Sequence, residues 1–285
     1  MAHGAEHEPQ AAGEGYELDS DTALEGLGEG RYRGEVSARW GVGAGPNGGY
    51  LAAFILRAVL AESALPDPLS LTVHYLSRPA EGPCELVVTR LREGRGHASY
   101  RADLVQSGEV RCAALATLGR LRPAGPLDFQ PEAPAVPPPE ECSAVRRLGE
   151  AAAIWERVEQ RVARPDDVFF MRAAPGEART GGWTRLLDGR PTDALALALF
   201  LDCWPPAVFG RTLQPDPIGA PTLEYTVHWR NGAASDWCYA SFETRALTGG
   251  YVDEEGELFD EEGTLVACSR QLARYDGSGR RAAGR

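Results

Sequence analysis

The chain has 285 residues and a formal net charge of −12, with 43% hydrophobic and 25% charged residues. These values are typical of a globular chain with a sizeable core, and the length suits one large domain or two ordinary ones. Because nucleic acid is bound by a basic face, the acidic balance argues against a nucleic-acid partner.

Targeting and metal-binding patterns are absent from the sequence. The N-terminal stretch has neither the basic start nor the apolar run of a secretory signal. No apolar stretch reaches the roughly 18 residues of a membrane helix, so we expect no membrane span. The six cysteines form no CxxC pair, which argues against a metal site and favours reduced, mostly buried thiols. The sequence therefore predicts a cytoplasmic protein without a metal or cofactor.

The first half predicts one buried helix between strands. Residues 32–40 alternate as a strand, and a glycine-rich break leads into a helix over 50–62. This helix is almost continuously apolar, and Arg57 is its only interior charge. The strands that follow, separated by glycine-containing turns, are predicted over 71–76, 85–91, 99–106 and 110–118.

A proline-rich segment divides the chain, and the second half repeats the plan of the first. Residues 123–140 contain seven prolines, which predicts an extended linker that we place at 123–150. A helix over 193–202, stopped by Pro205 and Pro206, follows a strand over 183–187. Further strands are predicted over 222–229, 237–244, 250–260 and 265–275. The acidic runs 253–255 and 260–262 are interpreted as solvated turns.

The two halves share short runs of similar residues as well as the order of their predicted elements. Thr72-Val73-His74-Tyr75 recurs as Thr226-Val227-His228-Trp229. Cys84 lies ten residues after His74 (84 − 74), and Cys238 lies ten after His228 (238 − 228). A repeat of this length indicates duplicated domains rather than a solenoid of short units.

Each predicted helix is apolar on nearly all sides, so it must be surrounded. The antiparallel strands after it are enough to curl around a single helix, which is the arrangement of the hotdog fold. The predicted fold is therefore α+β: a double hotdog in which two antiparallel sheets each wrap a central helix. We place the N-terminal hotdog at 20–122 and the C-terminal hotdog at 151–276; two unrelated α+β domains are the alternative.

Several runs together resemble the thioesterase II-type acyl-CoA thioesterase family, over about residues 30–120 and 150–275. The Trp-Pro-Pro turn at 204–206 is similar to the actinobacterial branch of that family. The runs that carry the resemblance are 46–50, 71–76, 114–119, 221–229 and 263–271.

The resemblance implies an acyl-CoA thioesterase that hydrolyses a fatty or related acyl thioester to free acid and thiol. Its substrate would be an acyl-CoA or an acyl-carrier thioester, and no cofactor is needed. In this family an Asp, a Thr and a Gln of the second hotdog hold the attacking water. Carried over to the matching positions, they are Asp202, Thr222 and Gln271.

The residue types suit this chemistry. Asp202 closes an apolar helix, whose negative dipole end disfavours the carboxylate and raises its pKa, as a general base requires. The neutral side chains of Thr222 and Gln271 can orient a water without competing for its proton. The structural alternative for Asp202 is a residue that caps the turn at Pro205 and Pro206.

Two further groups are candidate substrate-binding residues. Asn47, Gly48 and Gly49 open the first helix, where glycine amides can face a ligand as an oxyanion hole or a phosphate contact. A plain N-cap at Asn47 is the alternative. His74 is the other candidate, although its equivalence to His228 in the repeat favours a shared structural role.

Other functions and assembly states stay open at this point. An enoyl-thioester hydratase or dehydratase commonly uses an Asp/His dyad, and Asp202 has no nearby His in the sequence. A non-catalytic acyl-thioester binding protein is disfavoured because Asp202, Thr222 and Gln271 occur together. Exposed sheet edges leave a homodimer or a higher homo-oligomer open.

Overall fold

The computed structural model describes residues 15–43, 45–122, 125–145, 153–165, 174–212 and 219–275. Both ends of the predicted linker, and the predicted start and end of the second hotdog at 151 and 276, lie outside these ranges. In the described part of the chain, no helix is both long enough and apolar enough to cross a membrane.

Most strands belong to one sheet. Those of the first half are β1 (Glu25–Gly28), β2 (Arg31–Val36), β5 (Asp67–Tyr75), β6 (Gly82–Glu93), β7 (Ala98–Gln106) and β8 (Glu109–Gly119). Those of the second half are β9 (Ser143–Ala144), β10 (Val158–Val162), β11 (Arg179–Leu186), β12 (Thr222–Trp229), β13 (Cys238–Glu243), β14 (Leu247–Thr248), β15 (Tyr251–Asp260) and β16 (Leu265–Arg274). A separate small sheet pairs β3 (Gly41–Val42) with β4 (Gly45–Pro46).

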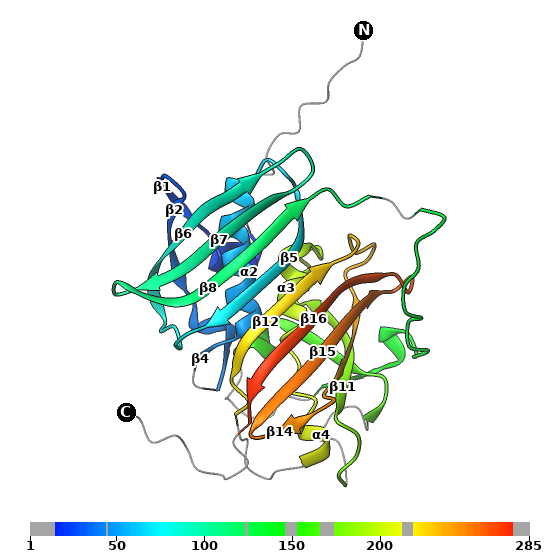
Figure 1. The fold of residues 1–285 in the computed structure, drawn as a ribbon. Helices are drawn as coiled ribbons and strands as arrows, with labels where there is room; N and C mark the ends of the chain where they lie inside the picture. Colours follow the sequence, from blue (N-terminus) through cyan, green and yellow to red (C-terminus); the bar gives the residue numbers. More distant parts are fainter. Residues whose placement is uncertain are drawn as a thin grey trace.

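The two predicted sheets are joined into a single antiparallel one. Among the described residues, 14 strands pair in the order β1-β2-β6-β7-β8-β5-β12-β16-β15-β13-β11-β10-β9, with β14 beside β15. The junction is the pair β5 and β12, which lies at the centre of the sheet in Figure 1. The strands before the proline-rich segment lie together in this order, as do those after it, but both groups share one continuous sheet.

The junction relates the two halves by a local two-fold axis. Thr72 and Thr226, which match in the repeat, lie directly opposite each other on β5 and β12. Their hydroxyl oxygens are 2.8 Å apart and their sequence separation is 154. Equivalent residues of two antiparallel strands can meet in this way only where a two-fold axis passes between them.

Both predicted helices are confirmed. The first, α2 (Gly48–Glu62), begins after Asn47, whose side chain accepts a hydrogen bond from the Tyr50 N–H. The second, α3 (Ala194–Phe200), begins after Asp193, whose carboxylate accepts from the N–H groups of Leu195 and Ala196. Sequence patterns missed the short helices α1 (Glu17–Asp21) and α4 (Phe209–Thr212) and the 3₁₀ turns η1 (Ala38–Trp40), η2 (Pro139–Glu141) and η3 (Ala153–Glu156).

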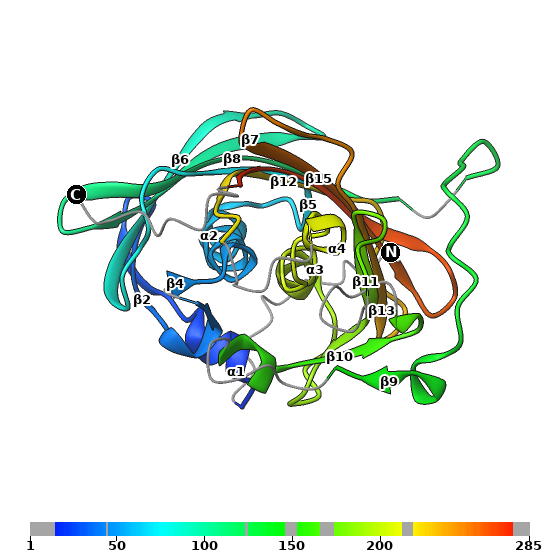
Figure 2. The same ribbon diagram turned by 90° about the horizontal axis from the view of Figure 1, so that it is seen from below.

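The two central helices lie side by side inside the curve of the sheet (Figure 2). α2 packs against β5, β6, β7 and β8, and α3 packs against α2 and β11. Tyr50, Phe54 and Phe200 are among the largest fully buried side chains of the core. Because protein surrounds each helix, the absence of a polar stripe in their sequences has a direct physical reason.

Two local predictions need correction. Residues 38–40 form a 3₁₀ turn rather than the end of a strand. Residues 253–255 lie inside β15 and are not a solvated turn. The proline-rich segment is docked on the second half: the Trp183 Nε1–H donates to the Pro137 carbonyl at 2.9 Å, and Gln130 bonds the backbone of Gly263. All six cysteines are free and four of them are buried, as the sequence predicts.

Candidate active site

Asp202 lies where the end of α3 meets the start of α2. α3 ends at Phe200, so Asp202 sits in the turn after the helix rather than inside it. Its Oδ2 accepts from the Gly49 N–H at 2.8 Å and from Asn47 Nδ2 at 3.0 Å. Asn47 Nδ2 also donates to the Asp202 carbonyl at 2.7 Å. The carboxylate is thus fixed by the first half of the chain although it belongs to the second.

Thr222 and Gln271 complete a hydrogen-bonded chain that ends on Asp202. The Thr222 hydroxyl donates to Gln271 Oε1 at 2.8 Å, and Gln271 Nε2 donates to Asp202 Oδ1 at 2.9 Å. Since the threonine occupies the amide oxygen, the amide nitrogen faces the carboxylate. The structure therefore brings together three residues that are 20 to 69 positions apart in the chain.

A β-bulge makes the contact of Thr222 possible. Strict alternation from the buried Tyr225 would turn Thr222 toward the outer face of the sheet. The register between β12 and β16 shifts between Thr222 and Glu224, which adds a residue on β12. The Thr222 hydroxyl therefore reaches Gln271 on the inner face.

Burial is the main cause of the altered acidity of Asp202. It raises the pKa of the half-buried Asp202 carboxyl to about 6, while the donors on Gly49, Gln271 and Asn47 lower it in part. The sequence argument predicted the direction but gave the wrong cause. The carboxylate faces the N-terminal amides of α2, whose dipole favours its charged form, so loss of water and not the dipole raises the pKa.

Gly48 and Gly49 allow the close approach of the two helix ends. A Cβ on Gly49 would lie 2.8 Å from the Ala198 carbonyl oxygen and 2.9 Å from Asp202 Cβ. A Cβ on Gly48 would lie 2.9 Å from Asp202 Oδ2. The Gly49 amide is engaged by Asp202, so the structure uses this amide to hold the carboxylate.

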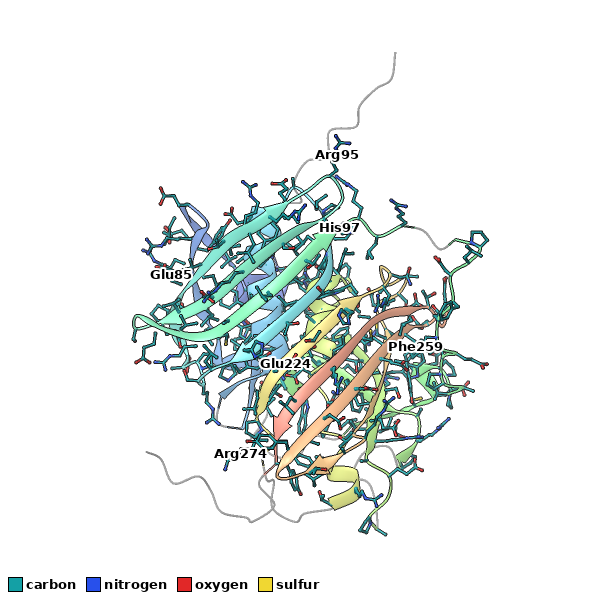
Figure 3. All side chains as sticks on the ribbon, in the orientation of Figure 1. Glu85, Arg95, His97, Glu224, Phe259 and Arg274 are labelled. Atoms are coloured by element: carbon teal, nitrogen blue, oxygen red, sulfur yellow. The ribbon has the colours of Figure 1, made fainter. Side chains whose placement is uncertain are left out.

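His74 lies away from this cluster. Its neighbours on β5 face inward: Val73 is buried, and the Tyr75 hydroxyl donates to the Gly48 carbonyl at 2.7 Å. Alternation along the strand then directs His74 outward, where it is exposed. Its cross-strand partner Glu224 lies near the centre of the sheet in Figure 3. The structure therefore separates His74 from the other predicted site residues.

Sequence reasoning missed two side chains next to the cluster, Tyr75 and Glu254. Tyr75 contacts Gly48, and burial together with the nearby Asp202 charge raises its pKa. Glu254 accepts a hydrogen bond from the Ala207 N–H at 2.5 Å, and burial raises its pKa to about 7. Period-two alternation from Val73 and from Val252 would have directed both side chains inward. No group of three or more His, Cys, Asp or Glu residues in the described ranges is arranged to hold a metal ion.

Family models match both halves of the chain. The acyl-CoA thioesterase N-terminal domain matches residues 36–119, and the acyl-CoA thioesterase C-terminal domain matches residues 131–275. The chain belongs to the acyl-CoA thioesterase family. As a member of this family it is a thioester hydrolase, which confirms the resemblance seen in the sequence.

Solved structures agree with this assignment. A protein provisionally named thioesterase II from Thermobifida fusca is 28% identical, with a TM-score of 0.84 over 93% of this chain and 100% of that one. A hot dog fold protein of unknown function from Alicyclobacillus acidocaldarius is 27% identical, with a TM-score of 0.83 over 92% and 99%. An acyl-CoA thioesterase II from Mycobacterium marinum, at 22% identity and a TM-score of 0.70 over 91% and 99%, shares the fold.

The Gly49→Ala variant of this thioesterase is expected to lose stability and activity together. The added methyl group meets backbone atoms of α3 at 2.8 and 2.9 Å, so the helix ends must separate. Overpacking of this kind costs about 1–3 kcal/mol, and it moves Asp202 away from its donors. Urea unfolding and thiol release measure the two effects. Gly232→Ala, whose methyl group would meet nothing within 4 Å, is the control and should change neither.

Proposed function

We propose that this thioesterase hydrolyses a fatty or related acyl thioester of CoA or a carrier protein, with Asp202 as the general base for water. Gln271 would orient that water, and Thr222 would hold the Gln271 amide in the required orientation. The observation that carries the proposal is the continuous hydrogen-bonded chain from Thr222 through Gln271 to Asp202.

The reaction needs only a positioned water and a base. The carboxylate of Asp202 takes one proton from the water as the water oxygen bonds to the thioester carbonyl carbon. The carbon–sulfur bond then breaks, and the proton passes from Asp202 to the departing thiolate. The products are the free acid and the thiol, and Asp202 returns to its charged form. No cofactor enters these steps.

The acidity of Asp202 predicts the pH dependence of the reaction. A general base acts in its deprotonated form, and burial raises the pKa of Asp202 to about 6. We therefore expect kcat/KM to be high above neutral pH and to fall as the pH decreases through about 6. Initial rates of thiol release between pH 5 and 8 test this expectation. A profile that stays flat down to pH 5 would exclude a base with this pKa.

We also propose that the chain is a double hotdog formed by duplication, with units at 20–122 and 151–276 and a linker at 123–150. The two-fold relation of Thr72 and Thr226 supports this proposal, as does the placement of one central helix in each half. The cytoplasmic location and the homo-oligomeric state stay predictions.

A panel of acyl-CoAs tests the proposed substrate class. Short, long and aryl acyl groups are presented on CoA and, in parallel, on an acyl carrier protein, and thiol release is measured with wild-type protein. Turnover of at least one member is expected, and the pattern gives the acyl length and the carrier. Binding of acyl-CoA without any turnover on either carrier would overturn hydrolysis in favour of a non-catalytic binding protein.

A further inference from the structure

Glu254 is a carboxylate on the inner face of the sheet, next to the candidate active site. On β15 the residues Val252, Gly256 and Leu258 are buried, so alternation places the Glu254 side chain on the same inner face. Its cross-strand neighbour on β16 is Gln271, the residue that donates to Asp202. A carboxylate in such an apolar row is costly unless it has a function or a strong partner.

The partner of Glu254 belongs to the segment that carries Asp202. The Ala207 N–H donates to Glu254 Oε2 at 2.5 Å, and Ala207 follows Asp202 by five residues. Pro205 and Pro206 lie between them and restrict the backbone, because each proline ring fixes its φ. The hydrogen bond from the Ala207 amide therefore also restrains the position of the Asp202 backbone.

Two neutral contacts hold the same turn. Gln160 Nε2 donates to the Cys203 carbonyl at 2.9 Å, and Trp204 Nε1 donates to the Thr184 hydroxyl at 2.7 Å. Both come from strands β10 and β11, on the side of the turn away from Gln271. Glu254 provides the contact from β15, and it is the ionisable member of the three.

Glu254 and Asp202 also act on each other through their charges. Burial raises the pKa of Glu254 to about 7, the Ala207 N–H lowers it, and the charge of Asp202 raises it again. Tyr225 on β12 also senses the charge of Glu254, and its buried phenol stays neutral near pH 7. Because the pKa of Glu254 is the higher of the two, Glu254 takes up its proton before Asp202 does as the pH falls.

We infer that Glu254 is a positioning residue for hydrolysis: by holding the Ala207 amide it fixes the turn after Asp202, so that the Asp202 carboxylate stays against Gln271. The inference rests on the proposed role of Asp202 as the base. It assigns Glu254 no contact with substrate or with the reacting water.

Two variants separate the hydrogen bond from Ala207 to Glu254 from the charge of Glu254. Glu254→Asp keeps the charge but is one methylene shorter and cannot hold Ala207. We expect its kcat to fall at least about tenfold, because a misplacement of one ångström can cost a hundredfold. Glu254→Gln keeps an oxygen for the Ala207 amide but loses the charge, so its kcat should stay well above that of Glu254→Asp. Because Glu254 is already mostly protonated where Asp202 titrates, the acid limb of the kcat/KM profile of Glu254→Gln should stay near that of the wild type.

The matched control is Glu255→Gln, because Glu255 is the neighbouring residue on the outer face and pairs with Arg245 at 2.9 Å. It should keep both the kcat and the pH profile of the wild type. Circular dichroism verifies folding of each variant. If Glu254→Asp does not fold, Glu254→Met, which has a similar length but no acceptor for the Ala207 amide, takes its place and should show the same fall in kcat relative to Glu254→Gln. Wild-type kcat in folded Glu254→Asp, or a kcat in Glu254→Gln as low as that in Glu254→Asp, would overturn the inference.

Asp202→Asn is measured in parallel to separate two failures. Full activity in Asp202→Asn would overturn the assignment of the base and the inference that rests on it. A large loss in Asp202→Asn, together with wild-type behaviour in both Glu254 variants, would overturn the role of Glu254 alone.

Discussion

Asp202→Asn is expected to lower kcat for acyl-CoA hydrolysis at least about a hundredfold, the scale of general-base loss. An asparagine side chain has nearly the same shape, but its amide cannot take a proton from water. Its Oδ1 can still accept from one of the present donors, so the turn after α3 should stay in place. KM should change little, because the substitution removes a proton acceptor and not a binding surface.

Thiol release under saturating substrate measures this effect. Asp128→Asn is the control, since Asp128 lies on the exposed proline-rich segment and accepts from the Gly125 N–H. Its kcat should equal that of the wild type. Clear wild-type activity that Asp202→Asn leaves intact would keep the thioesterase but remove Asp202 from its role.

Arg190→Ala is expected to have the largest effect on stability, about 3–5 kcal/mol. The Arg190 side chain is only 6% exposed and forms an ion pair with Asp19 of α1 at 2.9 Å and one with Asp193, the N-cap of α3, at 2.8 Å. Asp19 also pairs with Arg57 on α2. Removing the guanidinium leaves the buried Asp19 with one cation instead of two and takes a partner from the cap of α3.

Urea unfolding followed by circular dichroism measures the loss. Arg33→Ala is the control, because the Arg33–Glu25 pair is exposed, with 61% and 65% of the two side chains accessible. Exposed pairs contribute little, so the midpoint for Arg33→Ala should match that of the wild type. A midpoint for Arg190→Ala equal to that of Arg33→Ala would mean that the ion pairs do not hold α1 to the rest of the molecule.

Elements with a strong local pattern could be predicted from the sequence. Apart from Arg57 in α2, both α2 and α3 are apolar on nearly all sides, and prolines follow soon after each. Their type and position can therefore be predicted from the sequence. The long strands after each helix alternate or are rich in β-branched and aromatic residues. The α1 helix has only five residues, and it depends on the ion pairs of Asp19 with distant arginines, which no local pattern reveals.

The site could be assembled from the sequence only with the help of the family resemblance. For Asp202 the sequence offered a place at the end of an apolar helix, which pointed to the helix dipole where burial is the cause of the raised pKa. Thr222 reaches Gln271 because of a bulge, and bulges leave no reliable mark in a single sequence. Glu254 could have been placed on the inner face, because it follows the buried Val252 by two residues on the same strand. Its acidic neighbours suggested a solvated turn instead.

A single turnover in H₂¹⁸O tests most directly whether water or the Asp202 carboxylate attacks the thioester. Enzyme in excess over acyl-CoA is allowed to react once, and mass spectrometry then locates the isotope. Direct attack by water predicts one ¹⁸O atom in the released acid and none in the peptide that contains Asp202. If the Asp202 peptide carries the ¹⁸O and the acid is unlabelled, the carboxylate has attacked the thioester itself, and the role of general base is contradicted.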